Sequence, residues 1–313
     1  MKLYDWIIIA ITILLVVGIV IKNNAKKEST RQAEINRALN AIEGDNKMIQ
    51  LIHGDCLEKM KEIPDGSIDL TVTSPPYDNL RTYNGNISQW SEKKWKDIIK
   101  DLFRVTKHGG VVVWVVGDAT IKGSETGTSF KQALWAKECG FNLHDTMIYA
   151  KDCISFPDAN RYQNSFEYMF VWSKGILKIK NLISDRKNIS FGRKVTGTDR
   201  NADGTTRKVS CYGQDIKEFG IRWNIWDIKA DKGNSKTGHP AKFPDILAHD
   251  HILSWSNEGD TVLDPMMGSG TTGKMAKQLG RKFIGIELDE TYFNIAKERL
   301  NRALNMVEEM RGR

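Results

Sequence analysis

The sequence has little cysteine and no metal-binding pattern. Its 313 residues include four cysteines, Cys56, Cys139, Cys153 and Cys211, and no two of them form a C-x-x-C pair. Neither a zinc site nor a disulfide framework is therefore indicated, and no metal cofactor is expected. No Cys-His signature accompanies any of the four, so each is interpreted as a small buried hydrophobe rather than a nucleophile.

Acidic residues are too few to balance the basic ones. Lys and Arg number 46 against 39 Asp and Glu, which gives a formal net charge of +7, and the isoelectric point is near 9.0. This balance suits a polyanionic partner, although many basic proteins never bind nucleic acid. The 40% hydrophobic and 27% charged content argues against a disordered or fibrous chain. The length suits one large domain with an insert, or two modest domains.

A long apolar run occurs only near the N-terminus. The segment Trp6–Ile21 is apolar apart from Thr12 and is followed by Lys22, Lys26 and Lys27. This pattern predicts an apolar helix that anchors the protein in the membrane and leaves the bulk of the chain in the cytoplasm. No small-x-small pattern follows the run, which disfavours a cleaved signal peptide.

Met48 marks a predicted domain boundary. Residues 23–47 are polar and helix-friendly, whereas Met48 begins short β-rich runs that alternate with helical patterns. Residues 1–47 are therefore interpreted as an apolar helix with a polar linker. We also hypothesise that they derive from an upstream reading frame or a fusion. Abundant peptides that span Lys47 and Met48 in the native protein would contradict a start at Met48.

The remainder of the chain alternates strands with helices. Most of the expected strands are continuous apolar runs, which is typical of strands covered on both faces. They are Met48–Ile52, Ile68–Thr73, Val111–Val116, Thr146–Tyr149, Tyr168–Ser173, Thr261–Leu263 and Phe283–Glu287. A helix capped by Ser91 is expected to stop at Gly109-Gly110, and further helices are expected near Gly273–Leu279 and over Asp245–Ser256. This order predicts a Rossmann-like, doubly wound α/β fold with a mostly parallel sheet.

The amino-acid composition changes within a predicted insert at residues 174–238, which has glycines, few long apolar runs and many basic residues. Residues 174–236 hold 15 Lys and Arg and 7 Asp and Glu, a net charge of +8 against +7 for the whole chain. A solvated, loop-rich excursion would also explain this composition. Concentration of the net charge in one segment nevertheless favours a surface that contacts phosphates. The insert separates a predicted catalytic half, residues 48–173, from a predicted cofactor half, residues 239–313.

The strongest glycine motif follows the strand Thr261–Leu263. It reads Asp264-Pro265-Met266-Met267-Gly268-Ser269-Gly270-Thr271-Thr272 and precedes a helix, so its glycines allow close approach of a ligand to unpaired N–H groups. Glu287 ends the next strand 19 residues after Gly268, where a carboxylate can bind ribose hydroxyls. A dinucleotide-binding oxidoreductase shares these features. Asp264 disfavours that class, because a carboxylate can pair with an ammonium group but repels a pyrophosphate.

The predicted catalytic loop is Thr73-Ser74-Pro75-Pro76-Tyr77 at the end of the strand Ile68–Thr73. Exocyclic base amines are poor nucleophiles until hydrogen-bond acceptors draw out their lone pair. The two prolines lack N–H groups and fix the backbone, so the Pro75 carbonyl can act as an acceptor beside the Ser74 hydroxyl. Tyr77 offers an aromatic face to an extruded base. The catalytic residues are therefore predicted to be Ser74, Pro75, Pro76 and Tyr77.

These motifs resemble the beta class of amino methyltransferases, in which an S/T-S-P-P-Y or D-P-P-Y loop precedes the glycine motif. The resemblance runs from Met48 to the C-terminus and includes Gly54-Asp55-Cys56-Leu57, His239–Pro244 and Ile284–Glu287. It implies S-adenosylmethionine as cofactor, with Asp55 at the adenine and Glu287 at the ribose. The implied cofactor-binding set is Asp55, Cys56, Thr73, Asp264, Pro265, Met266, Gly268, Gly270, Thr271, Thr272 and Glu287. Met266 departs from the usual phenylalanine, for which it can fill similar apolar space.

Double-stranded DNA is the expected substrate, and the target base stays open. In the family a serine at this motif position is more often associated with cytosine N4 and an aspartate with adenine N6, so Ser74 favours cytosine, with adenine as the alternative. Basic residues of the insert are candidates for phosphates and guanine edges: Arg186, Lys187, Arg193, Lys194, Arg200, Arg207 and Lys208. The resemblance also allows a cognate restriction enzyme as partner. A membrane-tethered protein that binds nucleic acid without catalysis is the alternative of another class.

Overall fold

The computed structural model of the protein describes residues 48–77, 90–152, 160–229 and 243–311. The chain divides into two units, Met1–Ile49 and Gln50–Arg313, and the described residues belong almost wholly to the second. The predicted helix at residues 6–21, its linker, Cys153 and the segment His239–Lys242 lie outside the described residues. None of the helices within the described residues is long and apolar enough to cross a membrane.

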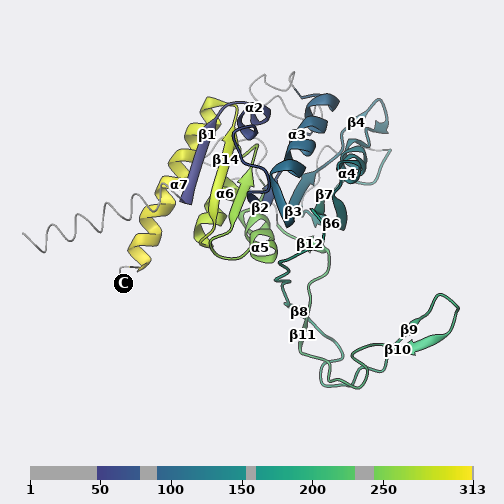
Figure 1. Cartoon of the computed structure of the whole chain (residues 1–313). Coiled ribbons are helices and arrows are strands. Elements are labelled where there is room, and N and C mark those ends of the chain that lie inside the picture. The colour runs from purple at the N-terminus through teal and green to yellow at the C-terminus, as the bar shows by residue number, and fades with distance from the viewer. Residues whose placement is uncertain (1–47, 78–89, 153–159, 230–242, 312–313) are drawn as a thin grey trace, which may run out of the picture. The chain divides into compact units, whose positions relative to one another are not determined.

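An eight-stranded sheet forms the centre of the second unit (Figure 1). Its order is β1 (Ile49–His53), β14 (Lys282–Glu287), β13 (Thr261–Asp264), β2 (Ile68–Thr73), β3 (Thr106–Val116), β7 (Phe166–Ser173), β6 (Asn142–Ala150) and β12 (Ile225–Asp227). Strand β13 runs parallel to β14 and β2, β2 to β3, and β12 to β6, whereas β7 is antiparallel to both of its neighbours. The predicted α/β class with a mostly parallel sheet is therefore confirmed.

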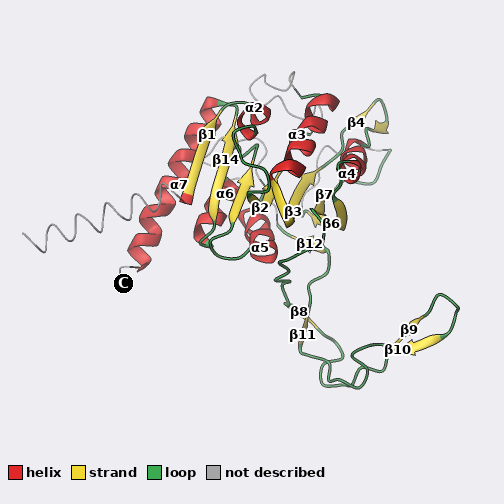
Figure 2. Ribbon diagram, in the orientation of Figure 1, coloured by secondary structure: helices red, strands yellow, loops and turns green. Residues whose placement is uncertain are grey.

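Helices cover both faces of the sheet (Figure 2). They are α2 (Cys56–Met60), α3 (Glu92–Val105), α4 (Thr128–Glu138), α5 (Asp245–Trp255), α6 (Thr271–Gln278) and α7 (Glu290–Arg311). Buried residues of α2, α3 and α4 pack with Trp114 and Trp172 in one cluster. On the opposite face His251 of α5 contacts the Met169 sulfur, and Gly273 of α6 lies against the Phe283 ring. Side chains alternate along each strand, so continuous apolar runs bury both faces.

Helix α3 is shorter than the sequence pattern predicted. Ser91 caps it as expected, accepting a hydrogen bond from the Lys94 N–H at 3.2 Å. The helix ends at Val105, however, and β3 begins at Thr106 without a loop. Gly110 does not stop the helix; a Cβ there would lie 2.8 Å from the Asp69 carbonyl oxygen. Gly110 instead lets β3 approach β2 closely.

Helix α4 was not predicted because its N-terminal cap comes from elsewhere in the chain. Its N-cap residue, Gly127, has no side chain to accept a hydrogen bond. Asp118 supplies the acceptor and binds the Ser129 N–H at 2.9 Å. Between β3 and α4 a small hairpin pairs β4 (Thr120–Ile121) with β5 (Ser124–Glu125).

The basic segment is an antiparallel two-stranded ribbon. Strand β8 (Arg186–Lys187) pairs with β11 (Phe219–Gly220), and β9 (Thr198–Arg200) pairs with β10 (Thr206–Lys208). At its base Arg222 donates to the buried Asp250 of α5 at 2.6 Å and also binds Asp185. The chain then rejoins the main sheet as β12, where Ile225 pairs with Ile148. The excursion therefore returns to the sheet within the predicted insert.

Candidate active site

The predicted motifs meet at one edge of the sheet. Parallel strands β2, β13 and β14 end there at Thr73, Asp264 and Glu287. The Thr73 hydroxyl donates to Asp264 Oδ1 at 2.7 Å, across 191 residues of sequence. Strand β1 ends beside them, because the Gly54 N–H donates to the Glu287 carbonyl at 2.9 Å. The catalytic loop and the glycine turn therefore occupy neighbouring strand ends, where ligands bind in open α/β sheets.

Asp264 is a buried carboxylate with internal hydrogen bonds. Its side chain accepts from Thr73 and, at 3.2 Å, from the Met266 N–H. Burial raises the pKa of Asp264 to about 6 despite these hydrogen bonds, and the nearby Glu287 carboxylate adds to the increase. A cation bound beside Asp264 would reverse this effect, because an opposite charge favours the ionised form.

The Glu287 carboxylate holds the glycine turn by a hydrogen bond from its backbone. The Gly268 N–H donates to Glu287 Oε2 at 2.8 Å, and the Asp289 N–H donates to Oε1 at 2.9 Å. Gly268 and Gly270 have φ values of 51° and 78°, which most side chains disfavour. Burial raises the pKa of Glu287. Each oxygen of a carboxylate has two lone-pair sites, so one on each remains to accept a ligand hydroxyl.

The start of α6 carries two threonines with different surroundings. The Thr272 hydroxyl donates to the Val72 carbonyl at 3.1 Å and joins α6 to β2. The Thr271 hydroxyl is buried and makes no hydrogen bond within the described part of the chain. An unpaired buried hydroxyl costs free energy unless a ligand or water satisfies it. Together with the lone pairs of Glu287 and the charge of Asp264, it fits the hydroxyl and ammonium groups of S-adenosylmethionine.

Asp55 and Cys56 lie beside the same edge at the start of α2. Asp55 caps this helix by accepting from the Leu57 N–H at 2.9 Å, and it pairs with Lys94 of α3 at 2.7 Å. Burial opposes its ionisation, but the hydrogen bonds from Lys94 and Leu57 hold the pKa of Asp55 below its usual value. Cys56 is buried, and burial raises the pKa of its thiol to about 12. That thiol therefore stays protonated, as the interpretation of a packed hydrophobe requires.

Two hydroxyls of the predicted catalytic loop are hydrogen bonded to each other. The Ser74 hydroxyl donates to the Tyr77 hydroxyl at 3.0 Å, and Tyr77 donates to Glu167 Oε2 at 2.9 Å. Lys151 donates to Glu167 Oε1 at 3.0 Å. The Tyr77 ring lies over Gly117, where an added Cβ would be 3.8 Å from two ring carbons.

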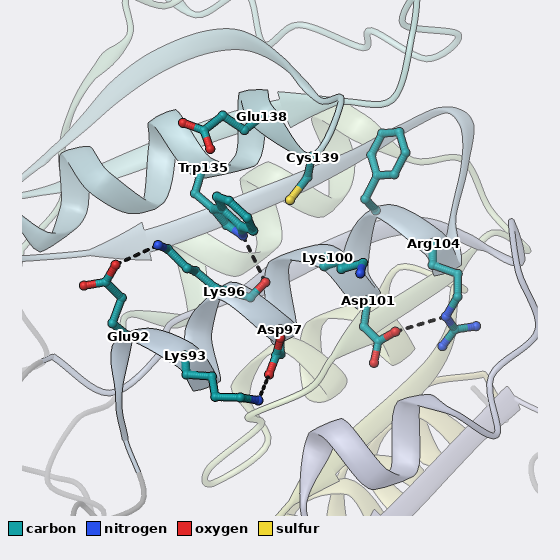
Figure 3. A pocket seen from close by; sticks show the side chains of 11 residues that line it. Glu92, Lys93, Lys96, Asp97, Lys100, Asp101, Arg104, Trp135, Glu138 and Cys139 are labelled. Carbon is teal, nitrogen blue, oxygen red and sulfur yellow. Dashed lines mark hydrogen bonds and ion pairs between the residues drawn. The ribbon is translucent and has the colours of Figure 1, made fainter.

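A hollow between α3 and α4 lies apart from these groups (Figure 3). Six of the charged side chains that line it form ion pairs: Lys96 with Glu92, Lys93 with Asp97, and Arg104 with Asp101. None of the predicted site residues lines it. The predicted motifs meet at the strand edge instead, so we assign the active site to that edge.

The fold and this edge define an α/β enzyme whose site suits a nucleoside cofactor. A family model described as DNA methylase matches residues 68–298. This match covers more than half of the chain, and the chain belongs to the DNA methylase family. The expectation of an S-adenosylmethionine-dependent amino methyltransferase of the N4/N6 type is thereby confirmed.

Relatives and solved structures agree with this assignment. The chain is 56% identical over 265 residues to the orphan methyltransferase M.BamHII of Bacillus amyloliquefaciens, covering 81% of this chain and 97% of the relative. It is 29% identical over 264 residues to DNA adenine methyltransferase YhdJ of Escherichia coli (strain K12), covering 82% and 84%. The solved complex of M1.HpyAVI with S-adenosylmethionine has a TM-score of 0.53 and 25% identity, covering 81% of this chain and 100% of that one. PvuII DNA methyltransferase, which is cytosine-N4-specific, shares the fold with a TM-score of 0.59 and 22% identity, covering 82% and 93%.

Three side chains at this edge were not predicted from the sequence. Lys94 pairs with Asp55, while Glu167 and Lys151 lie beside the catalytic loop. In the sequence, Glu167 is a charged residue within the otherwise largely apolar strand β7, and Lys151 directly follows β6. Neither position by itself indicates a role in the site. The antiparallel pairing of β6 with β7, in which Tyr149 lies opposite Glu167, brings Lys151 close to Glu167.

The bond between Thr73 and Asp264 is expected to stabilise the edge. Replacing Thr73 by valine should cost about 1–3 kcal/mol of unfolding free energy, because a buried acceptor loses its donor. Thr71 provides a matched control on the same strand, since its buried hydroxyl makes no hydrogen bond within the described residues. Thr71→Val should therefore be neutral or stabilising. Urea unfolding compares the two variants, and equal losses would contradict the role of Thr73.

Proposed function

We propose that this protein is a site-specific DNA methyltransferase that methylates the exocyclic amine of a flipped base, with cytosine N4 as the target. The observation that carries this proposal is the position of the Ser74 and Tyr77 hydroxyls. They follow the end of β2, and the adjacent strand β13 opens the glycine turn. An amine held by the loop would therefore lie next to a methyl donor held by the turn.

S-adenosylmethionine supplies an electrophilic methyl group on a sulfonium. The chain's own part is to bind and orient the donor: Glu287 accepts the ribose hydroxyls, Asp264 attracts the ammonium group, and Asp55 contacts the adenine. The remaining proposed contacts belong to the end of β2, the glycine turn and the starts of α2 and α6. They are Cys56, Thr73, Pro265, Met266, Gly268, Gly270, Thr271 and Thr272. Met266 packs against the apolar cluster, which supports its role as a replacement for phenylalanine.

The catalytic loop prepares the amine. Ser74 and the Pro75 carbonyl accept its two hydrogens, which favours the pyramidal geometry of a nucleophile. Pro76 keeps the backbone rigid, and Tyr77 stacks on the extruded base. Such stacking contributes about 1–3 kcal/mol per base and offsets part of the cost of unstacking.

Cytosine is favoured by the serine at position 74. Adenine N6 remains the second candidate, because the relative YhdJ is named an adenine methyltransferase. Alternatives of another class are weaker. A binding-only protein has no need for the whole set of loop, turn and buried carboxylates.

Expression in a host that lacks DNA methylation should yield N4-methylcytosine at one short sequence. Nucleoside mass spectrometry with modified-base sequencing gives the base and the site together. Ser74→Ala should lower the mark at least about 100-fold while the fold is kept, because one of two acceptors is lost. Ser67→Ala is the matched control, since that hydroxyl binds the Pro64 carbonyl away from the site. N6-methyladenine as sole product would overturn the choice of cytosine, and full activity of Ser74→Ala would overturn the site.

Affinity for S-adenosylmethionine should depend on pH through Asp264. The pKa of Asp264 is raised to about 6, so acid protonates it and removes its attraction for an ammonium group. Affinity should therefore fall as the pH is lowered from about 8 to about 5.5, by up to tenfold per pH unit below the pKa. Calorimetric titration measures it. Asp65→Asn, which alters an exposed carboxylate paired with Arg104, should keep the wild-type pH dependence, whereas Asp264→Asn should remove it. A constant affinity in the wild type would contradict the pairing.

The basic ribbon is the proposed DNA-recognition element. A two-stranded β-ribbon can enter the major groove and present side chains to base edges and phosphates. Among the predicted contacts, Arg186 stacks over Trp223, Lys208 over Tyr212, and Lys194 pairs with Asp215. Arg207 lies 3.9 Å from Asp199. Within the described residues the side chains of Lys187, Arg193 and Arg200 make no hydrogen bond or ion pair, so these three are readiest to bind phosphate.

Neutralising Lys187, Arg193 and Arg200 with glutamine should weaken DNA binding and its dependence on salt. If each contacts one phosphate, the slope of log affinity against log salt should become shallower by about 2.7. Fluorescence anisotropy over a salt series measures that slope. Neutralising Lys61, Lys282 and Lys297 removes the same charge outside the ribbon and should leave the slope nearly unchanged. Equal changes in both variants would show that net charge, not the ribbon, is responsible.

A further inference from the structure

A carboxylate and an ammonium group lie behind the catalytic loop. Glu167 belongs to β7, and Lys151 follows β6; the antiparallel pairing of these strands places them together. Their ion pair spans 3.0 Å, and the two side chains are only 15% and 13% exposed. The exposed pair of Lys61 and Glu58 on α2, by contrast, is 63% and 68% exposed. Charged side chains are rarely so enclosed unless they are paired, as these two are.

The ion pair meets the catalytic loop beside Gly117. A Cβ at Gly117 would lie 3.7 Å from Glu167 Cγ and 3.8 Å from the Tyr77 ring. The ring and the carboxylate side chain therefore both pack at the end of β3, next to Gly117. Glu167 Oε2 lies 2.9 Å from the Tyr77 hydroxyl, and Oε1 accepts a hydrogen bond from Lys151.

The chemistry of these groups fixes the direction of each hydrogen bond. An ionised carboxylate can only accept, so Tyr77 must donate its single proton to Glu167. Tyr77 can then only accept from Ser74, and Ser74 must give its own proton to Tyr77. The serine oxygen is left with lone pairs alone to offer to a base. Such an oxygen binds an amine and repels a carbonyl.

We propose that Glu167, held in place by Lys151, is a positioning residue that makes Ser74 a pure hydrogen-bond acceptor. The ion pair holds the carboxylate beside Tyr77, and the relay through Tyr77 orients the serine proton away from the base. The loop is thereby selective for exocyclic amines over carbonyl groups. This proposal rests on the proposed methyltransferase function and adds two residues to its specificity machinery.

The test is the single-turnover rate of methyl transfer to duplex DNA at saturating S-adenosylmethionine, in the full-length chain. Glu167→Gln should lower this rate about 10- to 100-fold, because an amide can donate to Tyr77 and reverse the relay. Affinities for S-adenosylmethionine and DNA should stay within about twofold of the wild type. Glu167→Asp keeps an acceptor and should recover part of the rate. Glu58→Gln disrupts the exposed ion pair and serves as the matched control.

A double-mutant cycle separates the relay from mere stabilisation. Tyr77→Phe keeps the ring but removes the hydroxyl through which Glu167 acts. In that background Glu167→Gln should change the rate by less than about twofold, whereas a structural role would lower it in both backgrounds. Lys151→Met should reduce the rate in the same direction as Glu167→Gln.

The outcomes distinguish this relay from the proposed function itself. A wild-type protein that transfers no methyl group to DNA would overturn both. An active wild type with an undiminished Glu167→Gln variant would overturn the relay alone. Equal effects of Glu167→Gln with Tyr77 and with Phe at position 77 would also overturn the relay, since they would assign Glu167 to stability.

Discussion

The alignment of β2 with β13 is the constraint on which the site depends. Its two partners are separated by almost two hundred positions in the chain, yet their ends are joined by a 2.7 Å hydrogen bond between Thr73 and Asp264. Parallel pairing places both carboxyl ends at one edge, so the catalytic loop and the glycine turn meet without any long loop. Thr272 strengthens this alignment from the helix side by donating to the Val72 carbonyl. A shift in this pairing would separate the amine from the methyl donor.

The same edge carries a cost in free energy. Asp264 and Glu287 are both largely buried, and burial raises the pKa of each. The Glu287 carboxylate raises the pKa of Asp264 further, and the Asp289 carboxylate does the same for Glu287. The unpaired Thr271 hydroxyl adds to this cost. Groups of this kind are commonly found where a ligand with an ammonium group and hydroxyls is bound, because that ligand satisfies them. The unfavourable features of this edge are thus those that a nucleoside cofactor with a positive charge would relieve.

Charge is divided between two surfaces with different roles. Along α3 the charges pair with one another, as with Lys96 and Glu92, so the hollow beside it is close to neutral. The ribbon concentrates positive charge on a narrow antiparallel element whose base is tied to α5 through Arg222 and Asp250. Long-range attraction for a polyanion can therefore be supplied by the ribbon, while positioning of the reacting groups is supplied by the sheet.

The sequence by itself determined the features that depend on local pattern. Strand β2, the start of α3 at Ser91, the glycine turn and the proline loop follow from burial periodicity, capping and backbone restriction within a few residues. The tertiary structure alone decided the partners of these motifs: Lys94 on Asp55, Glu167 and Lys151 behind Tyr77, and the pairing of the basic segment into a ribbon. The early end of α3 and the cap of α4 by Asp118 belong to the same group. Such contacts join residues far apart in the chain, and their register is fixed by strand pairing and packing rather than by the residues nearby in sequence.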